Sequence, residues 1–139
     1  WGDGFWQDVM HYPGSGHLGL AARFLRRYPW QDFQRLQAYP VSDDNADHAM
    51  RAAGVPGKVR MHYRPPWSIE CGAWPGPDGP NINLSDGERY TRMFFFNPRT
   101  GAELPLDMPA DTSGGIAAPD PPSREDWVWV LENDGAGAV

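Results

Sequence analysis

Cysteine, long apolar runs and clustered positive charge are all scarce in this chain of 139 residues. Cys71 is the single cysteine, which excludes an internal disulfide and a cysteine-based zinc site. No apolar run approaches the length that spans a membrane, so we expect no membrane partner. The net charge of −6 argues against nucleic acid as a partner, because nucleic-acid binders need clustered positive charge.

The sequence also lacks the short motifs that mark common catalytic and metal sites, such as a nucleophile elbow, a phosphate loop or HExxH. The four histidines are scattered, and His11 and His17 are separated by a Pro-Gly break that does not fix a metal. The acidic stretch 43–54 begins like a calcium loop but lacks its sixth-position glycine and twelfth-position glutamate. We therefore expect neither a metal nor a cofactor, and the spacing names no catalytic residue.

Glycine, proline and aromatic residues are abundant instead. The 16 glycines and 15 prolines indicate many turns and short strands, and 7 tryptophans provide large rings for a core or for ligand contacts. The segment 90–96 predicts an aromatic strand, which ends at the turn sequence Asn97-Pro-Arg-Thr-Gly101 and restarts at Leu104 as a hairpin. Both faces of this strand carry apolar side chains, so we expect it to be covered on both sides and paired with segment 126–132.

The fold expected from these patterns is mainly β, an antiparallel β-sandwich with one or two N-terminal α-helices. Helical spacing of apolar residues predicts a helix over 17–28 with Ser15 as its N-cap, and Pro29 ends it and begins a second short one. We divide the chain into an N-terminal loop and helical segment (1–45), a β-sandwich domain (46–132) and a flexible tail (133–139).

Two further segments complete the expected sandwich. The strand 58–64 alternates, which predicts one face pointing inward (Val59, Met61, Tyr63) and one pointing to solvent (Lys58, Arg60, His62, Arg64). The segment 109–124 is rich in proline, glycine, aspartate and serine, and it predicts a long surface excursion with Ile116 as its anchor.

Aromatic residues on loops are the candidate ligand contacts. Trp67 and Trp74 lie in a loop braced by proline and glycine, where flat rings would contact sugars or proline-rich ligands at little entropic cost. Tyr63, which lies just before this loop, and the N-terminal loop residues Trp6 and His11 complete the candidate set. The alternative is that the Trp67 and Trp74 rings simply pack onto the sandwich.

Two blocks of sequence resemble a known family. Tyr90-x-x-x-Phe-Phe-Phe-Asn-Pro-Arg-Thr-Gly-x-Glu and the later Asp-Trp-Val-x-Val-Leu-Glu resemble the C-terminal β-sandwich of apiosidase-like glycoside hydrolases, a module often labelled a collagen-binding domain. Segment 5–36 is similar to the last barrel loop and helix that precede that module. The resemblance implies a module that follows a (β/α)8 barrel. The family's catalytic carboxylates lie on earlier barrel strands, so none is carried over, while Trp6 and His11 match a segment bordering the substrate pocket.

The resemblance implies a non-catalytic carbohydrate-associated module that binds polysaccharide or oligosaccharide, or that braces a catalytic barrel. Hydrolysis would then require the barrel, and the location would be secreted or periplasmic. The alternatives are a small stand-alone or assembled glycan-active enzyme and an extracellular-matrix protein binder. A brace should expose an apolar patch around Leu18, Leu25 and Trp30. The sequence begins at Trp1 without a targeting segment, which suggests a processed product, a trimmed form or a piece of a longer protein.

Overall fold

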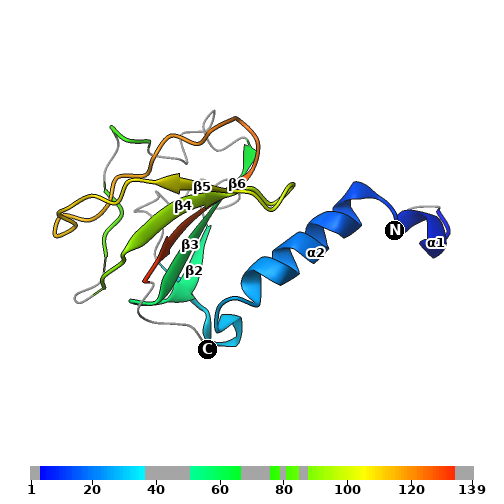
Figure 1. The fold of residues 1–139 in the computed structure, drawn as a ribbon, viewed down its shortest axis with the longest axis horizontal. Helices are drawn as coiled ribbons and strands as arrows, with labels where there is room; N and C mark the ends of the chain where they lie inside the picture. Colours follow the sequence, from blue (N-terminus) through cyan, green and yellow to red (C-terminus); the bar gives the residue numbers. More distant parts are fainter. Residues whose placement is uncertain (1–3, 37–50, 67–75, 79–80, 85–87, 134–139) are drawn as a thin grey trace, which may run out of the picture.

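The computed structural model of the chain describes residues 4–36, 51–66, 76–78, 81–84 and 88–133. Its centre is a six-stranded antiparallel sheet with the order β1-β2-β3-β6-β4-β5 (Figure 1). The elements are α1 (Trp6–Val9), α2 (Pro13–Leu25), η1 (Trp30–Asp32), β1 (Gln34–Leu36), β2 (Arg51–Val55), β3 (Val59–Arg64), β4 (Arg92–Phe96), β5 (Glu103–Leu106) and β6 (Trp127–Glu132). The prediction of a mainly antiparallel β fold with one or two N-terminal helices is confirmed.

The predicted aromatic hairpin is present as β4 and β5. Its turn is held by Asn97, whose side-chain oxygen accepts a hydrogen bond from the Arg99 N–H at 2.9 Å and whose carbonyl accepts one from the Gly101 N–H at 2.8 Å. Gly101 has a φ of 78°, which glycine adopts without the strain that a Cβ would cause. The predicted pairing with segment 126–132 is also confirmed, because β6 lies between β3 and β4.

Both faces of the sheet are covered. The helix-side face packs against the end of α2 and is formed by Val59, Met61, Phe94, Phe96 and Val130. The loop-side face carries Met93, Phe95, Trp127, Trp129 and Leu131. In the described part of the chain, the layer over the loop-side face consists of loop segments, which a backbone bridge between Ile82 and Ile116 ties together. Ile116 is buried, so the prediction that it anchors the 109–124 segment is confirmed.

The helices begin and end differently from the prediction. α2 begins at Pro13 and ends at Leu25. Proline fits the first turn of a helix, because a backbone N–H at that position would have no partner within the helix. Ser15 is not the N-cap, since its hydroxyl donates to the Val9 carbonyl at 3.2 Å. The short second helix is the 3₁₀ turn η1. No helix in the described ranges is long and apolar enough to cross a membrane.

The predicted N-terminal segment contributes an edge strand to the sheet, since β1 pairs with β2. The predicted domain boundary near residue 45 and the predicted tail beyond residue 133 lie outside the described residues.

The predicted orientation of β3 is confirmed for Val59 and Met61, which are buried, and it is wrong for Tyr63 and for the face predicted to meet solvent. Arg60, His62 and Arg64 are all 2% exposed or less, and Tyr63 is the exposed residue of this strand at 41%. The period-2 pattern correctly identifies which residues share a face, but it does not say which face the rest of the chain covers. The loop segments cover the polar face, so His62 is a core residue.

Candidate functional site

A helical arm projects from the sheet and exposes apolar side chains (Figure 1). We call residues 4–19, which comprise α1 and the first half of α2, the arm. Every arm residue is exposed except Val9 and His17, which are half-buried. The large apolar side chains that are more than half exposed are Phe5, Trp6, Met10, Tyr12 and Leu18. Single apolar side chains on a surface are ordinary, but here five large ones lie on one projecting segment.

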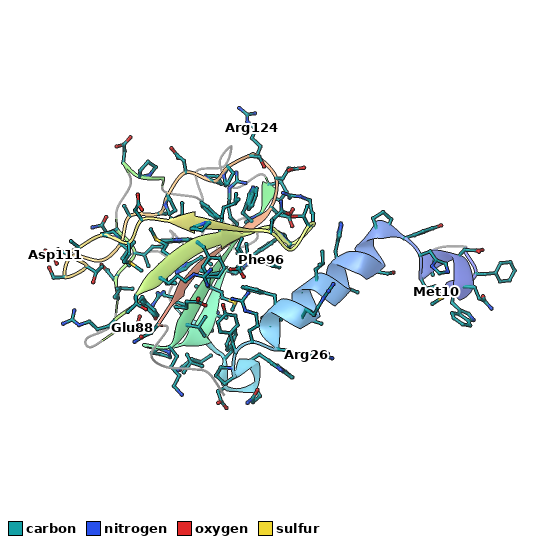
Figure 2. The ribbon with its side chains drawn as sticks, in the orientation of Figure 1. Met10, Arg26, Glu88, Phe96, Asp111 and Arg124 are labelled. Atoms are coloured by element: carbon teal, nitrogen blue, oxygen red, sulfur yellow. The ribbon has the colours of Figure 1, made fainter. Side chains whose placement is uncertain are left out.

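Aromatic packing fixes the base of the arm to the sheet. Phe24, near the end of α2, stacks on Phe96 with ring centroids 3.9 Å apart and an angle of 12° between the rings. It also meets Phe94 and Tyr28 edge to face at 6.3 Å and 5.5 Å. Phe24 is the buried residue of α2, so the second half of the helix is anchored while the first half extends beyond the sheet, and Met10 lies farther out, at the end of α1 (Figure 2).

A close approach to the hairpin turn sets the direction of the arm. A Cβ built on Gly101 would lie 3.1 Å from the Cδ2 atom of Leu20, which is tighter than an ordinary contact. The missing side chain at Gly101 therefore allows α2 to pass directly over the turn between β4 and β5. This glycine thus serves both the hairpin turn and the packing of the arm.

An ionic network joins the same helix to the sheet. Arg92 donates to Glu103 at 2.7 Å and to Glu132 at 2.5 Å, Tyr28 donates to the second oxygen of Glu132 at 2.5 Å, and Arg27 pairs with Glu103. The hydrogen bonds to Glu103 and Glu132 raise the pKa of Arg92. Burial alone would raise the pKa of Glu103, but the hydrogen bonds from Arg27 and Arg92 outweigh it and lower that pKa. The chain just beyond Phe24 is thereby fixed to β4, β5 and β6.

A second ionic cluster lies buried on the loop-side face. The carboxylate of Glu88 accepts from Arg60 at 3.2 Å and from the Tyr90 hydroxyl at 2.9 Å, and both ionic side chains are 3% exposed. The Nε–H of Arg60 also donates to Nε2 of His62 at 3.1 Å. Because a guanidinium only donates, Nε2 must accept, and the neutral ring carries its hydrogen on Nδ1. This cluster stabilises the core, and its burial separates it from any ligand that approaches from solvent.

The buried His62 makes the stability of the fold depend on pH. Burial, and then the neighbouring Arg60 charge, lower the pKa of His62 from its ordinary value of 6.5 to about 3. Between these two values the unfolded chain binds a proton that the folded chain does not, so stability falls as pH falls below about 6.5. We expect His62 to lower the free energy of unfolding by about 2 kcal/mol between pH 7 and pH 5. Urea unfolding of the native chain and of His62→Gln at both pH values checks this, and equal losses in the two proteins would contradict it.

Tyr63 marks an open part of the helix-side face. Its cross-strand neighbours are Arg51, which is exposed, and Val128, which is half-buried. Partial burial, and then the nearby Asp126 carboxylate, raise the pKa of Tyr63. Asp126 is itself held by Arg99, whose NH1 donates to the carboxylate at 2.5 Å and to the Asp126 carbonyl at 2.9 Å. Arg51 and Asp126 are therefore the charged neighbours of Tyr63 at this end of the sheet.

The structure separates the candidate ligand contacts from one another. Trp6 lies in α1 and His11 closely follows α1, and both are exposed, whereas Tyr63 lies in β3 of the sheet, so these three do not form one site (Figure 1). Trp67 and Trp74 lie outside the described residues. Over the described ranges, no three histidine, cysteine, aspartate or glutamate side chains gather as metal ligands do.

Sequence reasoning identified Trp6 and Leu18 of the arm surface but named none of its other large apolar residues. Leu18 lies on the predicted apolar stripe of the helix and is 74% exposed, as a brace requires. Phe5, Met10 and Tyr12 are visible as large apolar residues in a short glycine-rich segment, and that density is the available signal. Helical spacing identifies an apolar stripe, but it does not show how far along the helix the sheet covers that stripe.

Comparisons with known proteins give a likeness in structure alone. No family model matches the chain, and no curated protein matches it. A solved structure described as "Glycoside hydrolase" is similar over 99% of this chain, with a TM-score of 0.64 and 11% sequence identity. The chain spans 29% of the length of that protein. The chain therefore has a fold related to one part of a glycoside hydrolase.

Proposed function

We propose that this chain is a non-catalytic module of an apiosidase-like glycoside hydrolase and that it braces the catalytic (β/α)8 barrel through the arm. The exposed apolar surface of the arm carries the proposal. The match to the solved glycoside hydrolase covers 99% of this chain and so includes the arm, while more than two thirds of that protein lies outside the match. An arm that projects beyond its own sheet is suited to contact such a remainder.

The anchored base of the arm makes it suitable for docking. Exposed apolar area contributes roughly 25 cal/mol per Å² when it is buried against a partner. Phe24 and the ionic network already fix the direction of α2, so less conformational freedom is lost on docking than for a loose segment. A brace requires exposed apolar residues around Leu18 and Trp30, and both are more than half exposed, whereas Leu25 packs against the helix-side face.

The pairing of four carboxylates in and beside the sheet supports a non-catalytic role for these residues. Glu88, Glu103, Glu132 and Asp126 are all engaged by arginines. A general acid or base must reach the substrate with a carboxyl group that is able to exchange protons. Carboxylates held in these ion pairs stabilise the fold, so hydrolysis would be performed by the barrel. Because polysaccharide substrates lie outside the cytoplasm, we place the assembled enzyme in a secreted or periplasmic location.

The experiment pairs this chain with the catalytic domain encoded in the same gene, each produced as a separate polypeptide. We expect association with a Kd of about 10 μM or tighter, as for a modest interdomain interface. Replacing Trp6 and Leu18 together with serine should raise that Kd by at least about tenfold, because large apolar anchors dominate such interfaces. Both side chains are exposed in this chain, so its own fold should be unaffected.

The matched control replaces two exposed polar residues of the same helices, Gln7 and Arg23, with serine. This variant should bind within about twofold of the native chain, because exposed polar groups at an interface contribute little. Equal losses in the two variants would show that the apolar surface is not the contact. A gene that encodes no catalytic domain would contradict the proposal at its first step.

A further inference from the structure

We propose that residues 13–19 of α2, which we call the outer half-helix, are folded in only a minority of free molecules and are completed as a helix when the arm docks on the catalytic barrel. This coupling rests on the brace proposed above and adds a means of regulation to it. The strength of docking would be set by how easily the outer half-helix folds, as well as by the apolar contacts that it makes.

α2 consists of two halves that differ in their tendency to form a helix. The outer half-helix has the sequence Pro13-Gly-Ser-Gly-His-Leu-Gly19, in which glycine occupies every second or third position. The inner half, Leu20-Ala-Ala-Arg-Phe-Leu25, consists mainly of strong helix formers. At each interior position, glycine lowers the helix–coil equilibrium about fivefold relative to alanine, because it has more backbone freedom to lose. The outer half-helix is therefore the weak part of α2.

Contacts with the sheet begin where the strong half begins. Leu20 meets the hairpin turn at Gly101, and Phe24 is buried against the sheet. The residues of the outer half-helix are exposed, apart from the half-buried His17. Among the described residues, no side chain caps the start of the helix, where Tyr12 occupies the N-cap position. A short helical segment without capping or packing is marginal in water, so the outer half-helix has little to hold it folded.

The fold of this chain does not require the glycines of the outer half-helix. A Cβ built on Gly14, Gly16 or Gly19 would meet no atom of the described residues within 4 Å, apart from the helix's own backbone and the chain neighbours. By contrast, Gly115 has a φ of 86°, and a Cβ there would lie 2.3 Å from the Ile82 carbonyl oxygen. Alanine would fit at the three helix positions, so their glycines weaken the helix without improving the packing of this chain.

The three glycines also do not share one side of the helix, as a surface for close helix–helix contact would require. Successive residues of an α-helix are about 100° apart around its axis. Gly16 and Gly19 therefore lie about 60° from each other, while Gly14 lies about 160° from Gly16 and about 140° from Gly19. One docked partner does not approach all of these directions closely. The arrangement favours a weakened helix over a glycine contact surface.

A helix that folds on docking lowers the apparent affinity of the brace. Only the free molecules with a folded outer half-helix present Leu18 in the geometry that docks, so the apparent Kd rises as that fraction falls. Suppose that about one free molecule in six is folded here; two glycine-to-alanine changes would shift the equilibrium about 25-fold, to about five in six. The apparent Kd would then fall about fivefold.

The test compares the native chain with the double variant Gly16→Ala/Gly19→Ala, by hydrogen–deuterium exchange of the free chain and by binding to the separately produced catalytic domain. Protection factors of the amides of residues 17–19 should be close to 1 in the native chain and about 6 in the variant, and Kd should fall about fivefold. Gly114→Ala is the matched control, because Gly114 is exposed outside the helices and its Cβ would meet the Asn81 side chain at an ordinary 3.9 Å. It should leave both quantities unchanged.

The other outcomes separate a failure of the coupling from a failure of the brace. Protection factors above about 10 in the native chain would show that the outer half-helix folds without a partner. Equal protection in the double variant and the native chain would show that the glycines do not weaken the helix. Raised protection with an unchanged or higher Kd would show that folding is not coupled to docking. These three results overturn the coupling and leave the brace standing, whereas no association of either protein with the catalytic domain would overturn both.

Discussion

Replacing Arg60 with methionine should lower the free energy of unfolding by about 3–5 kcal/mol, because it leaves the Glu88 carboxylate buried without its positive partner. Both side chains are 3% exposed, and the same guanidinium also donates to Nε2 of His62. Methionine is an unbranched side chain that carries no charge and fills much of the space of arginine. The lost stability therefore comes mainly from the broken ion pair and only in small part from a cavity. Urea unfolding at pH 7 measures the change.

Two further variants identify the cause of that loss. Adding Glu88→Gln to Arg60→Met removes the uncompensated charge and should recover more than half of the lost stability. Lys58→Met removes an exposed cation directly before β3 and should change stability by no more than about 0.5 kcal/mol. A double variant as unstable as Arg60→Met alone would show that the buried charge is not the cause.

Replacing Phe24 with alanine should lower the free energy of unfolding by about 3–5 kcal/mol, the usual cost of removing a buried phenylalanine. The ring is 5% exposed and stacks on Phe96, so its loss opens the helix-side face and releases the base of the arm. Thermal or urea unfolding of the variant gives the magnitude.

Leu18→Ala is the matched control for this change, because it truncates a large apolar side chain on the same helix at a position that is 74% exposed. It should change stability by no more than about 0.5 kcal/mol. A cost for Leu18→Ala similar to that for Phe24→Ala would mean that the first half of α2 packs on the sheet in solution, which would contradict an arm that is free to contact a partner.

Local chemistry made the hairpin and its partner strand predictable. The sequence from Asn97 to Gly101 contains the residues that a turn requires. The strand before it carries large apolar side chains on both faces, which favours burial of both faces. The alternation of tryptophan and valine in 126–132 identified β6 for the same reason. These features depend on residues close together in sequence, so the sequence alone was sufficient.

Burial was harder to predict where it depends on distant segments. His62 alternates with apolar neighbours as a solvent-facing residue would, but the loops around Ile82 and Ile116 cover its face. Leu18 has the helical spacing of a core residue, but the sheet ends before it. In both cases the deciding contacts come from parts of the chain far away in sequence, which periodicity does not report.

Hydrogen–deuterium exchange of the arm, with and without the catalytic domain attached, tests the proposed brace most directly. In this chain alone, the amides of residues 14–19 should exchange much faster than those of β6, because an exposed half-helix opens locally. With the catalytic domain attached, exchange in 14–19 should slow by at least about tenfold, since a partner that binds the folded helix stabilises it, while exchange in β6 stays unchanged. Arm exchange that is the same in both proteins would contradict the claim that the arm docks this module against a catalytic barrel.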